Sequence, residues 1–433
     1  MLIAGEASGD LLAAELVQAL RPALAQVETR PTADSQPLHA SLAPRFFGAG
    51  GPRMAAAGVE LAFDLTQHSV IGLWEALKNY GKFKRMLDQL LQLARERQPD
   101  AIICVDFSGF NRRLAHAIKN DVRARQNVFF NWNPKLIQYV SPQVWASRPS
   151  RADKMAKDID LLLAIFPFEK DWYAKRTPHL RVEFVGHPII DRYARRTCPT
   201  DVPGRTAAGD RGLAVEAVCD RPGEGKAAVL DRRYNSERAA AEHSPMIVLL
   251  PGSRVAELKR HLPVMLGALR AIRSAKPAVR ARMVLPNEEL LHQAKQFAGN
   301  SERLEIESGG LAEALSQATV AIASTGTVTM ECAYFGVPTV ALYKTSWSTY
   351  QVGKRVIRVR FLAMPNLLAD EPLFPEFIQR EANAENISRA ALELIGDEAR
   401  RNQIKARLTE VIASLGGPGA SARAAAAIVG LLG

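Results

Sequence analysis

The sequence predicts an α/β protein made of two Rossmann-like domains that face a cleft. Short apolar runs alternate with helical patterns along most of the chain, which is typical of parallel strand–helix units. These runs form two groups, on either side of a polar stretch from about residue 197 to 243. A length of 433 residues also exceeds what one hydrophobic core usually holds.

Each apolar run predicts one buried strand. The first group contains MLIA, RFFGAG, AIICVD, LIQYVS and LLLAIF, and the second contains MIVLLP, RMVLP, TVAIAS and TVALY. Residues 197–243 between the groups are rich in Arg, Asp, Gly and Ala and poor in large apolar side chains, which predicts a mobile insertion. We expect an N-terminal domain at 1–190, a second domain at 244–365, and C-terminal helices at 366–433 that pack back toward the first domain.

The composition is that of a globular protein, with 47% hydrophobic and 23% charged residues. No apolar run approaches the roughly 18 to 20 residues that span a bilayer, and Glu6 and Asp10 interrupt the start, so neither a membrane span nor a signal peptide is predicted. A cytoplasmic location follows. The cysteines are far apart and form no CxxC pair, so we expect reduced thiols rather than disulfides or a zinc site: Cys104, Cys198, Cys219 and Cys332.

The opening GEASGD, residues 5–10, predicts a turn at the carboxyl end of the first strand. Ligands of α/β proteins bind at such strand ends. We expect a helix at 11–20, capped by Ser8 or Asp10, whose free N–H groups face an anionic or hydroxylated ligand. An ordinary capped strand-to-helix turn explains the same residues, and on these residues alone both interpretations stay open.

The stretch ASTGTVTMECAYFGVP, residues 323–338, predicts a nucleotide site. TVAIAS forms a strand, Gly326 permits a tight turn, and a helix follows to Phe335. Threonines surround the N-terminus of that helix, where a diphosphate binds well: Thr325, Thr327 and Thr329. Glu331 lies about one turn further on and is able to bind the two hydroxyls of a ribose. Capping threonines that hold no ligand are the alternative.

Another strand, MIVLLP, ends in the turn PGSR at 251–254. Arg254 carries a guanidinium fork that pairs with phosphate oxygens at any pH. The GxxxxGK[ST] spacing of a Walker loop is missing here, and FGAGGPRM at 47–54 does not match GxGxxG. Kinase and dehydrogenase functions therefore lose support.

Polar residues also end strands in the first half of the chain. Asp106 follows the buried run AIICV and is predicted either to act as a general base, if partial burial raises its pKa, or to cap the next helix. Ser141 ends another strand in the stiff turn SPQVW. His187 falls at the domain junction, where a lone His is more often a hydrogen-bonded hinge residue than a catalyst. No HExxH motif or His/Cys cluster indicates a metal site.

A basic amphipathic stretch lies at 68–93, in a chain whose formal charge is +11. Lys78, Lys82, Lys84 and Arg85 interleave there with apolar residues at helical spacing. These apolar residues are Val70, Leu73, Trp74, Leu77, Tyr80, Leu87, Leu90 and Leu91. A stripe that faces the core is one interpretation. The other is a surface that places Trp and Leu in lipid while lysines contact anionic headgroups. Charge alone leaves nucleic acid and phosphorylated substrates open as well.

Taken in order, these motifs resemble one family, the lipid-A-disaccharide synthases. The likeness covers nearly the whole chain through AGEASGD, GAGGPRM, VDFSGFN, YVSPQVWA, FVGHPIID, LLPGSR, STGTVTMECAYFGVP and MPNLLADEPLFPEFIQ. It implies an inverting glycosyltransferase of the two-domain GT-B type that joins UDP-2,3-diacylglucosamine to 2,3-diacylglucosamine 1-phosphate. The implied products are the β-1,6 lipid A disaccharide 1-phosphate and UDP. The resemblance implies neither a metal nor a cofactor.

The resemblance also implies the site residues. Asp106 and Arg254 match the acid and the PGSR arginine of the family's catalytic site. The implied UDP-sugar side is Gly252, Ser253, Arg254, Ser324, Thr325, Gly326, Thr327, Thr329, Glu331, Asn366 and Gln379. The implied acceptor side is Gly5, Glu6, Ser8, Gly9, Asp10 and Ser141. Membrane contact is expected through Val70, Leu73, Trp74, Leu77, Lys78 and Lys82.

The implied partners are the acylated UDP-sugar donor, the acylated acceptor and the anionic surface of the inner membrane. We expect the protein to be cytoplasmic and peripherally associated with that membrane, without a nucleic acid partner. The acyl-chain length and a homodimer stay open.

The chain departs from the family pattern in three places. The family usually has an acid after the proline of D-x-P-D-F-N, whereas this chain has Ser108 and Gly109. Residues 197–243 have no clear family counterpart, and family members have a few more strand residues before AGE, which suggests a late start. The alternatives are another GT-B UDP-sugar enzyme, such as the muramyl-peptide glucosaminyltransferase or a 2-epimerase, and a non-catalytic nucleotide-binding or membrane-adaptor protein.

Overall fold

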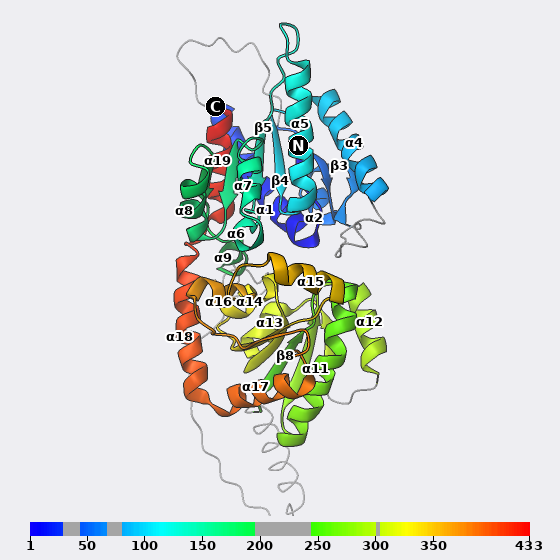
Figure 1. Ribbon diagram of the computed structural model, residues 1–433, viewed down its shortest axis with the longest axis vertical. Coiled ribbons are helices and arrows are strands. Elements are labelled where there is room, and N and C mark those ends of the chain that lie inside the picture. Colours follow the sequence, from blue (N-terminus) through cyan, green and yellow to red (C-terminus); the bar gives the residue numbers. More distant parts are fainter. Residues whose placement is uncertain (29–43, 67–79, 195–243, 300–303) are drawn as a thin grey trace, which may run out of the picture. The chain divides into compact units, whose positions relative to one another are not determined.

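The computed structural model describes residues 1–28, 44–66, 80–194, 244–299 and 304–433. The predicted insertion at 197–243 lies outside these residues, as do Cys198 and Cys219. The described chain divides into two compact units, each built on one parallel sheet (Figure 1). The predicted α/β class with two Rossmann-like sheets is therefore confirmed. Cys104 and Cys332 are buried free thiols.

Unit 1 comprises Met1–Arg192, Ser346–Arg360 and Ile412–Gly433. Its sheet has the strand order β3-β2-β1-β4-β5-β6-β7. The strands are β1 (Leu2–Ala4), β2 (Phe47–Gly50), β3 (Glu60–Asp64), β4 (Ala101–Val105), β5 (Lys135–Tyr139), β6 (Leu161–Ala164) and β7 (Arg181–Phe184). The helices are α1 (Ala7–Glu28), α2 (Pro52–Ala56), α4 (Tyr80–Arg97), α5 (Ser108–Arg125), α6 (Val144–Ser147), α7 (Ser150–Met155), α8 (Pro167–Arg176), α9 (Pro188–Ala194), α15 (Trp347–Val356) and α19 (Ala420–Leu432).

Unit 2 comprises the described residues of Tyr193–Thr345 and Phe361–Val411. Its sheet has the strand order β10-β9-β8-β11-β12-β13. The strands are β8 (Met246–Leu250), β9 (Arg280–Leu285), β10 (Leu304–Ser308), β11 (Val320–Ser324), β12 (Thr339–Tyr343) and β13 (Glu376–Ile378). The helices are α11 (Val255–Ala275), α12 (Glu288–Ala298), α13 (Leu311–Gln317), α14 (Thr327–Tyr334), α16 (Met364–Ala369), α17 (Ala384–Gly396) and α18 (Glu398–Ser414), the last of which ends in unit 1.

The inner strands match the predicted apolar runs because helices cover both faces of each sheet. All residues of β1, β6, β8 and β11 are buried, as expected for strands of a parallel sheet. The edge strands β3, β7 and β10 carry half-buried and exposed residues instead. Their sequences hold no continuous apolar run, so the apolar-run criterion does not find them.

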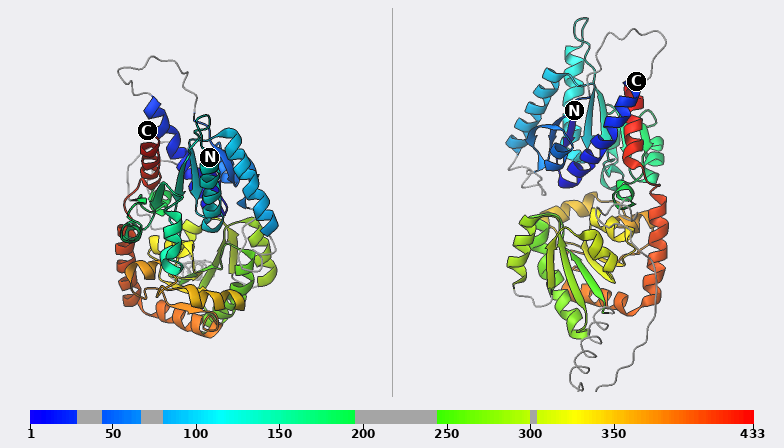
Figure 2. Two further views of the ribbon diagram at one scale, coloured as in Figure 1. Left: turned by 45° about the horizontal axis from the view of Figure 1, so that its top comes forward. Right: turned by 180° about the vertical axis from the view of Figure 1, so that it is seen from behind.

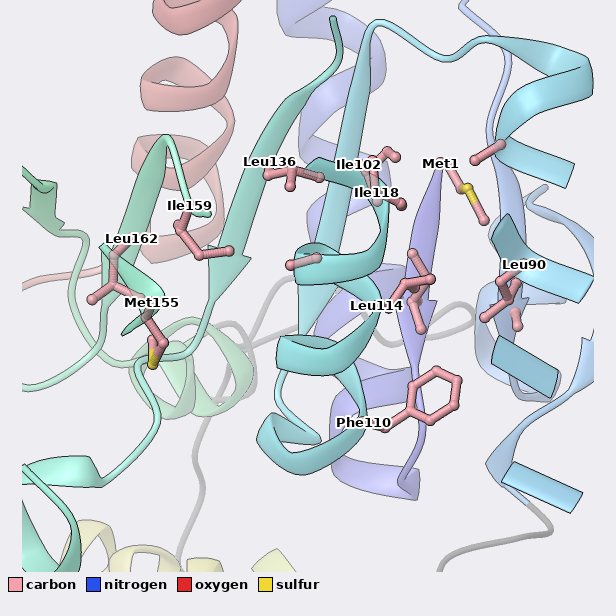
Figure 3. Packing of buried hydrophobic residues seen from close by; sticks show 14 of the residues in the cluster. Met1, Leu90, Ile102, Phe110, Leu114, Ile118, Leu136, Met155, Ile159 and Leu162 are labelled. Atoms are coloured by element: carbon pink, nitrogen blue, oxygen red, sulfur yellow. The ribbon is translucent and has the colours of Figure 1, made fainter. Parts of the chain in front are cut away.

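The core of unit 1 lies between one face of its sheet and the helices α4 and α5 (Figure 3). Met86 and Leu90 of α4 are buried there, and Leu87 and Leu91 pack against the same cluster. A lipid-facing role is therefore wrong for this part of the predicted stripe, because its apolar side chains face the core. Val70, Leu73, Trp74, Leu77 and Lys78 lie outside the described residues, and Lys82 is exposed on α4.

The C-terminal residues 366–433 do not form one body. Residues up to Val411 belong to unit 2, where α17 packs on α11. The final helix α19 belongs to unit 1 and packs along α1, with which it lies side by side in Figure 2. Ala420, Ala424 and Ala425 of α19 are buried. Their small side chains let the two helices approach closely.

Within the described ranges, none of the helices has the length and apolarity that crossing a bilayer requires.

Candidate active site

Each sheet has one point where the strand order reverses, and most of the predicted site residues lie there. In unit 1 this point lies between β1 and β4, and in unit 2 it lies between β8 and β11. The carboxyl ends of these strands lead into residues 5–10 and Asp106, and into residues 251–254 and 324–327. Ligands of open α/β sheets bind beside such reversal points. The structure therefore brings most residues predicted for the acceptor side together in unit 1 and most residues predicted for the donor side together in unit 2.

The GEASGD turn is tighter than the sequence predicts. The helix begins at Ala7, not at residue 11, and runs to Glu28. Gly5 is required here, since a Cβ at this position would lie 2.1 Å from the ring of Phe107. A Cβ at Gly9 would lie 3.4 Å from the carbonyl oxygen of Val105, which is an ordinary van der Waals contact. Gly5 is therefore the glycine that lets the GEASGD turn lie directly against Phe107, just after β4.

Asp10 caps a helix other than the predicted one. Its carboxylate is buried and accepts hydrogen bonds from the backbone N–H groups of Gly51, Arg53 and Met54, at 2.8, 3.0 and 3.0 Å. These groups belong to the first turn of α2, whose N-cap residue Gly51 has no side chain to offer. A carboxylate at a helix N-terminus is stabilising. Asp10 therefore joins the first two strand–helix units, which leaves Glu6 and Ser8 as the more accessible polar side chains of this turn.

Replacing Asp10 with alanine is expected to lower the free energy of unfolding by about 1–3 kcal/mol, since three helix N–H groups lose a charged acceptor. Urea unfolding followed by circular dichroism measures this change. Ser8→Ala is the matched control, because it alters the same turn without touching the α2 cap. An unchanged unfolding midpoint in Asp10→Ala, together with lost turnover, would instead show that Asp10 binds the acceptor.

Asp106 lies in a strained turn at the end of β4. Asp106 and Phe107 are consecutive non-glycine residues in the left-handed region, with φ of 49° and 41°. Such conformations cost on the order of 1–3 kcal/mol each and persist where the surroundings hold them. Here the buried Asn111 amide donates to the carbonyl oxygen of Asp106 at 2.9 Å, and Gln138 donates to the same oxygen at 3.3 Å. The turn is thus held by two buried side chains.

The carboxylate of Asp106 is half-buried and lies 3.5 Å from the hydroxyl of Ser8, which donates to it. Helix α5 begins at Ser108, and its N-cap residue is Phe107 rather than Asp106. The N-cap position predicted as an alternative for Asp106 is therefore occupied by its neighbour. Asn111 and Gln138 were not singled out from the sequence, although their place beside the end of β4 and within β5 was visible in it.

Ser141 belongs to a buried network behind the turn that follows β5. Its hydroxyl lies 3.3 Å from that of Tyr173, and Trp145 donates its indole N–H to Glu169 at 3.0 Å. Glu169 also accepts from the backbone N–H of Phe166 at 3.2 Å. Burial raises the pKa of Glu169 to about 7. Ser141 therefore supports the SPQVW turn from inside, and Glu169 is a buried titratable group that the sequence pattern did not indicate.

Replacing Glu169 with glutamine should remove a pH dependence of stability. The folded protein keeps the proton of Glu169 up to a pH of about 7, whereas the ordinary pKa is 4.5. Between these values the folded state binds the extra proton, so the free energy of unfolding falls as pH rises, by at most about 1.4 kcal/mol per pH unit. Urea titrations of both proteins from about pH 5 to 8 measure this difference. Parallel profiles for the two proteins would contradict it.

In unit 2, the PGSR turn closes on an acid in the first turn of α11. Gly252 has φ of 122°, and a Cβ there would lie 2.4 Å from a carboxylate oxygen of Glu257. That carboxylate accepts from the backbone N–H of Ser253 at 3.1 Å and from Arg254 at 3.3 Å. Glu257 thus orients Arg254, which is the N-cap residue of α11. Glu257 was not singled out from the sequence, although an acid three residues after Arg254 was the available signal.

The turn predicted to bind the nucleotide leads from β11 into α14, as expected from the sequence. Gly326 is the N-cap residue, with φ of 137° and no side-chain cap. Gly326 and Thr327 are exposed and Thr325 is half-buried, whereas Ser324 is buried. Thr329 differs from the prediction: its side chain is fully buried and donates to the carbonyl oxygen of Gly326 at 2.7 Å. The exposed helix N-terminus remains suited to an anion, while Thr329 stabilises the turn.

Glu331 lies one turn into α14 and is half-buried. The hydroxyl of Tyr193 donates to its Oε1 at 3.1 Å. The Tyr193 ring in turn packs against Tyr334 and Phe335, with ring centroids 5.1 and 4.9 Å away. Tyr193 therefore orients the carboxylate, a role that the sequence pattern did not reveal.

Asn366 and Gln379 form hydrogen bonds around β13, an edge strand of the unit 2 sheet. The fully buried Asn366 amide donates to the carbonyl oxygen of Phe374 and to Glu376, and it accepts from the backbone N–H of Phe374. Gln379, at φ of 55°, exchanges hydrogen bonds with the backbone of Thr345 at 3.3 and 3.2 Å. Both side chains thus have hydrogen-bond partners within unit 2, and their implied contact with UDP-sugar stays a prediction.

Two histidines are structural residues. His261 of α11 is fully buried, lies 2.7 Å from the carbonyl oxygen of Pro251 through Nδ1, and accepts from the backbone N–H of Lys344 through Nε2 at 3.0 Å. Burial lowers its pKa, which keeps the ring neutral. His187 accepts from the backbone N–H of Ile189, and burial lowers its pKa to about 3. His187 is thus hydrogen-bonded, as expected, and its hinge role stays a prediction.

The fold is of the GT-B type, which glycosyltransferases and epimerases share. Solved structures that share it include the UDP co-structure of S. aureus MnaA, with a TM-score of 0.58 at 13% identity, covering 100% of this chain and 96% of that one. The calicheamicin glycosyltransferase has a TM-score of 0.51 at 14% identity, covering 99% of this chain and 96% of that one. At these identities the likeness concerns the fold alone.

The chain belongs to the lipid-A-disaccharide synthetase family and is a glycosyltransferase of that family. The family model matches residues 1–201 and 230–429. Lipid-A-disaccharide synthases from Geobacter metallireducens and Myxococcus xanthus are each 32% identical, over 437 and 433 residues, covering 100% of this chain and 97% of each relative. The synthase from Alkalilimnicola ehrlichii is 30% identical over 435 residues, covering 100% of this chain and 98% of the relative.

Proposed function

We propose that the protein transfers 2,3-diacylglucosamine from UDP to the 6-hydroxyl of 2,3-diacylglucosamine 1-phosphate, with inversion at the anomeric carbon. The observation that carries this proposal is the pair of reversal points in a chain of this family. One holds a carboxylate, Asp106, in a braced turn, and the other holds Arg254 beside an uncapped helix N-terminus. The products are the β-1,6 disaccharide 1-phosphate and UDP.

The unit 2 residues bind the donor in this proposal. The N-terminus of α14 and the guanidinium of Arg254 face the diphosphate, since both favour negative charge. Glu331 accepts hydrogen bonds from the ribose hydroxyls in an orientation set by Tyr193. Arg254 and the helix also stabilise the charge that develops on UDP as it leaves.

The unit 1 residues act on the acceptor. Asp106 takes the proton of the 6-hydroxyl while the hydroxyl oxygen forms a bond to the anomeric carbon. The bond between that carbon and the phosphate oxygen breaks on the opposite face, and its electron pair leaves with UDP. Ser8, which donates to Asp106, and Glu6 lie on the acceptor side of this step.

The decisive assay for this function uses purified protein, UDP-2,3-diacylglucosamine and the monosaccharide 1-phosphate. The expected result is stoichiometric release of UDP and β-1,6 disaccharide, identified by mass spectrometry and by the anomeric proton coupling. Release of free sugar, or epimerised UDP-sugar without disaccharide, would instead support another UDP-sugar enzyme of this fold.

The proposed place of action is the cytoplasmic surface of the inner membrane, because acylated substrates reside there. Replacing Val70, Leu73, Trp74 and Leu77 together with serine is expected to reduce vesicle binding and turnover of long-chain substrate, with UDP affinity unchanged. Vesicle sedimentation and calorimetry with UDP measure the two quantities. Loss of the fold in this variant would show that these side chains are core, and unchanged sedimentation would exclude them from the contact.

A further inference from the structure

Helix α15, Trp347–Val356, is a well-formed helix without a buried residue. Its start is capped by Ser346, whose hydroxyl accepts from the backbone N–H of Thr349 at 3.3 Å. Beyond its end, the backbone N–H of Arg358 donates to the carbonyl oxygen of Ala146 at 2.8 Å, which ties the segment to α6 within unit 1. Despite this order, the side chain of Trp347 is 75% exposed and that of Ile357 is 44% exposed.

The same segment carries a concentration of positive charge. Lys354, Arg355, Arg358 and Arg360 are exposed, and the sequence contains no acid between Lys344 and Asp370. Where residues are described, no carboxylate forms an ion pair with Lys354, Arg355 or Arg358. The helix dipole favours cations in the last turn of a helix, which explains why Lys354 and Arg355 lie there. It does not explain Arg358, which lies beyond the helix.

Two valines of α15 lie away from Trp347. Val352 and Val356 recur at a spacing of four residues and are half-buried. Trp347 and Lys354 lie on the opposite side of a helix with 3.6 residues per turn.

We propose that α15 and the segment to Arg360 dock on an anionic phospholipid surface. Trp347 enters the headgroup region, where tryptophan is favoured, and Lys354, Arg355 and Arg358 contact lipid phosphates. This inference rests on the proposed function in one respect, that acylated substrates require an enzyme at a membrane. The surface is distinct from the predicted contact at Val70 to Lys82.

The test compares binding of the full chain to two kinds of vesicle, phosphatidylglycerol with phosphatidylethanolamine and pure phosphatidylcholine. The variants are Arg355→Gln/Arg358→Gln and Trp347→Ser. The matched control is Arg389→Gln/Arg400→Gln, which removes two exposed positive charges from α17 and α18. Calorimetry with UDP and circular dichroism confirm that each variant is folded.

We expect wild type and control to sediment with the anionic vesicles and not with phosphatidylcholine. Each cation contributes about fivefold to binding, equivalent to about 1 kcal/mol, so the double arginine variant should bind about 25-fold more weakly. Trp347→Ser should also bind more weakly while its UDP affinity stays unchanged. Sedimentation of both α15 variants at the level of the control overturns the proposal. So does a loss of poly(U) binding with vesicle binding unchanged, which would indicate nucleic acid instead.

The readouts separate this inference from the proposed function. Weak vesicle binding by the α15 variants, in a protein that forms no disaccharide, supports the docking surface and rejects the reaction. Disaccharide formation by variants that bind vesicles like the control rejects the docking surface and leaves the reaction supported.

Discussion

Asp106→Asn is expected to lose about 10²- to 10⁴-fold in turnover and to keep the UDP affinity of wild type. An amide is unable to accept the proton of the attacking hydroxyl, and a positioned base contributes about this much to the rate. The substitution suits the site because asparagine tolerates the left-handed conformation of residue 106, where φ is 49°. Disaccharide formation under saturating substrate gives the turnover, and calorimetry gives the UDP affinity.

Two further variants sharpen this test. Asp100→Asn changes an exposed acid at the other end of β4 and should leave turnover unchanged. A Cβ added at Gly109 would meet no atom within 4 Å, so Gly109→Asp restores the acid of the family pattern without a clash. If Asp106→Asn keeps turnover within a few-fold of wild type, the base lies elsewhere. Recovery of turnover in Asp106→Asn/Gly109→Asp would show that either acid is able to serve.

Arg254→Ala and Glu331→Ala are each expected to weaken UDP binding by about 10- to 150-fold. The first removes a charged contact to the diphosphate and the second removes hydrogen bonds to the ribose, and hydrogen bonds to charged groups contribute about 1.5–3 kcal/mol. Calorimetry with UDP and with uridine separates the two effects. Arg254→Ala should weaken UDP binding far more than uridine binding, whereas Glu331→Ala should weaken both alike.

Arg260→Ala is the control for these variants, because Arg260 is exposed on the same helix and donates to the carbonyl oxygen of Ala256. Its UDP affinity should equal that of wild type. Unchanged UDP affinity in both Arg254→Ala and Glu331→Ala would place the donor site away from the PGSR and STGT turns.

Much of the fold is predictable from local pattern. The inner strands are continuous apolar runs because parallel sheets are covered on both faces, and the turns after β4, β8 and β11 follow directly from where those runs end. The edge strands were not predictable in this way. β3 and β7 have a single neighbour in the sheet and carry exposed residues, so their sequences lack the apolar run that marks an inner strand.

The candidate site was also predictable only in part. The positions of Asp106, Arg254 and Glu331 at strand or helix ends could be predicted, since such ends collect where parallel strands finish. Most partners of these residues could not be predicted. Tyr193 and Gln138 act through contacts that depend on how separate segments fold together. Glu257 is the exception, because it lies only three residues after Arg254.

The sequence by itself determined the α/β class, the family and which loops carry polar chemistry, because these depend on residue type and spacing along the chain. Only the tertiary structure decided what each polar side chain does. Asp10 accepts from a helix 41 or more residues away, Asn366 satisfies the backbone of Phe374, and Leu90 faces the core. A buried polar group needs a hydrogen-bond partner, and an apolar face of a helix or sheet needs another element to pack against it. The hydrogen-bond partner and the packing element both come from segments that come together only when the chain is folded.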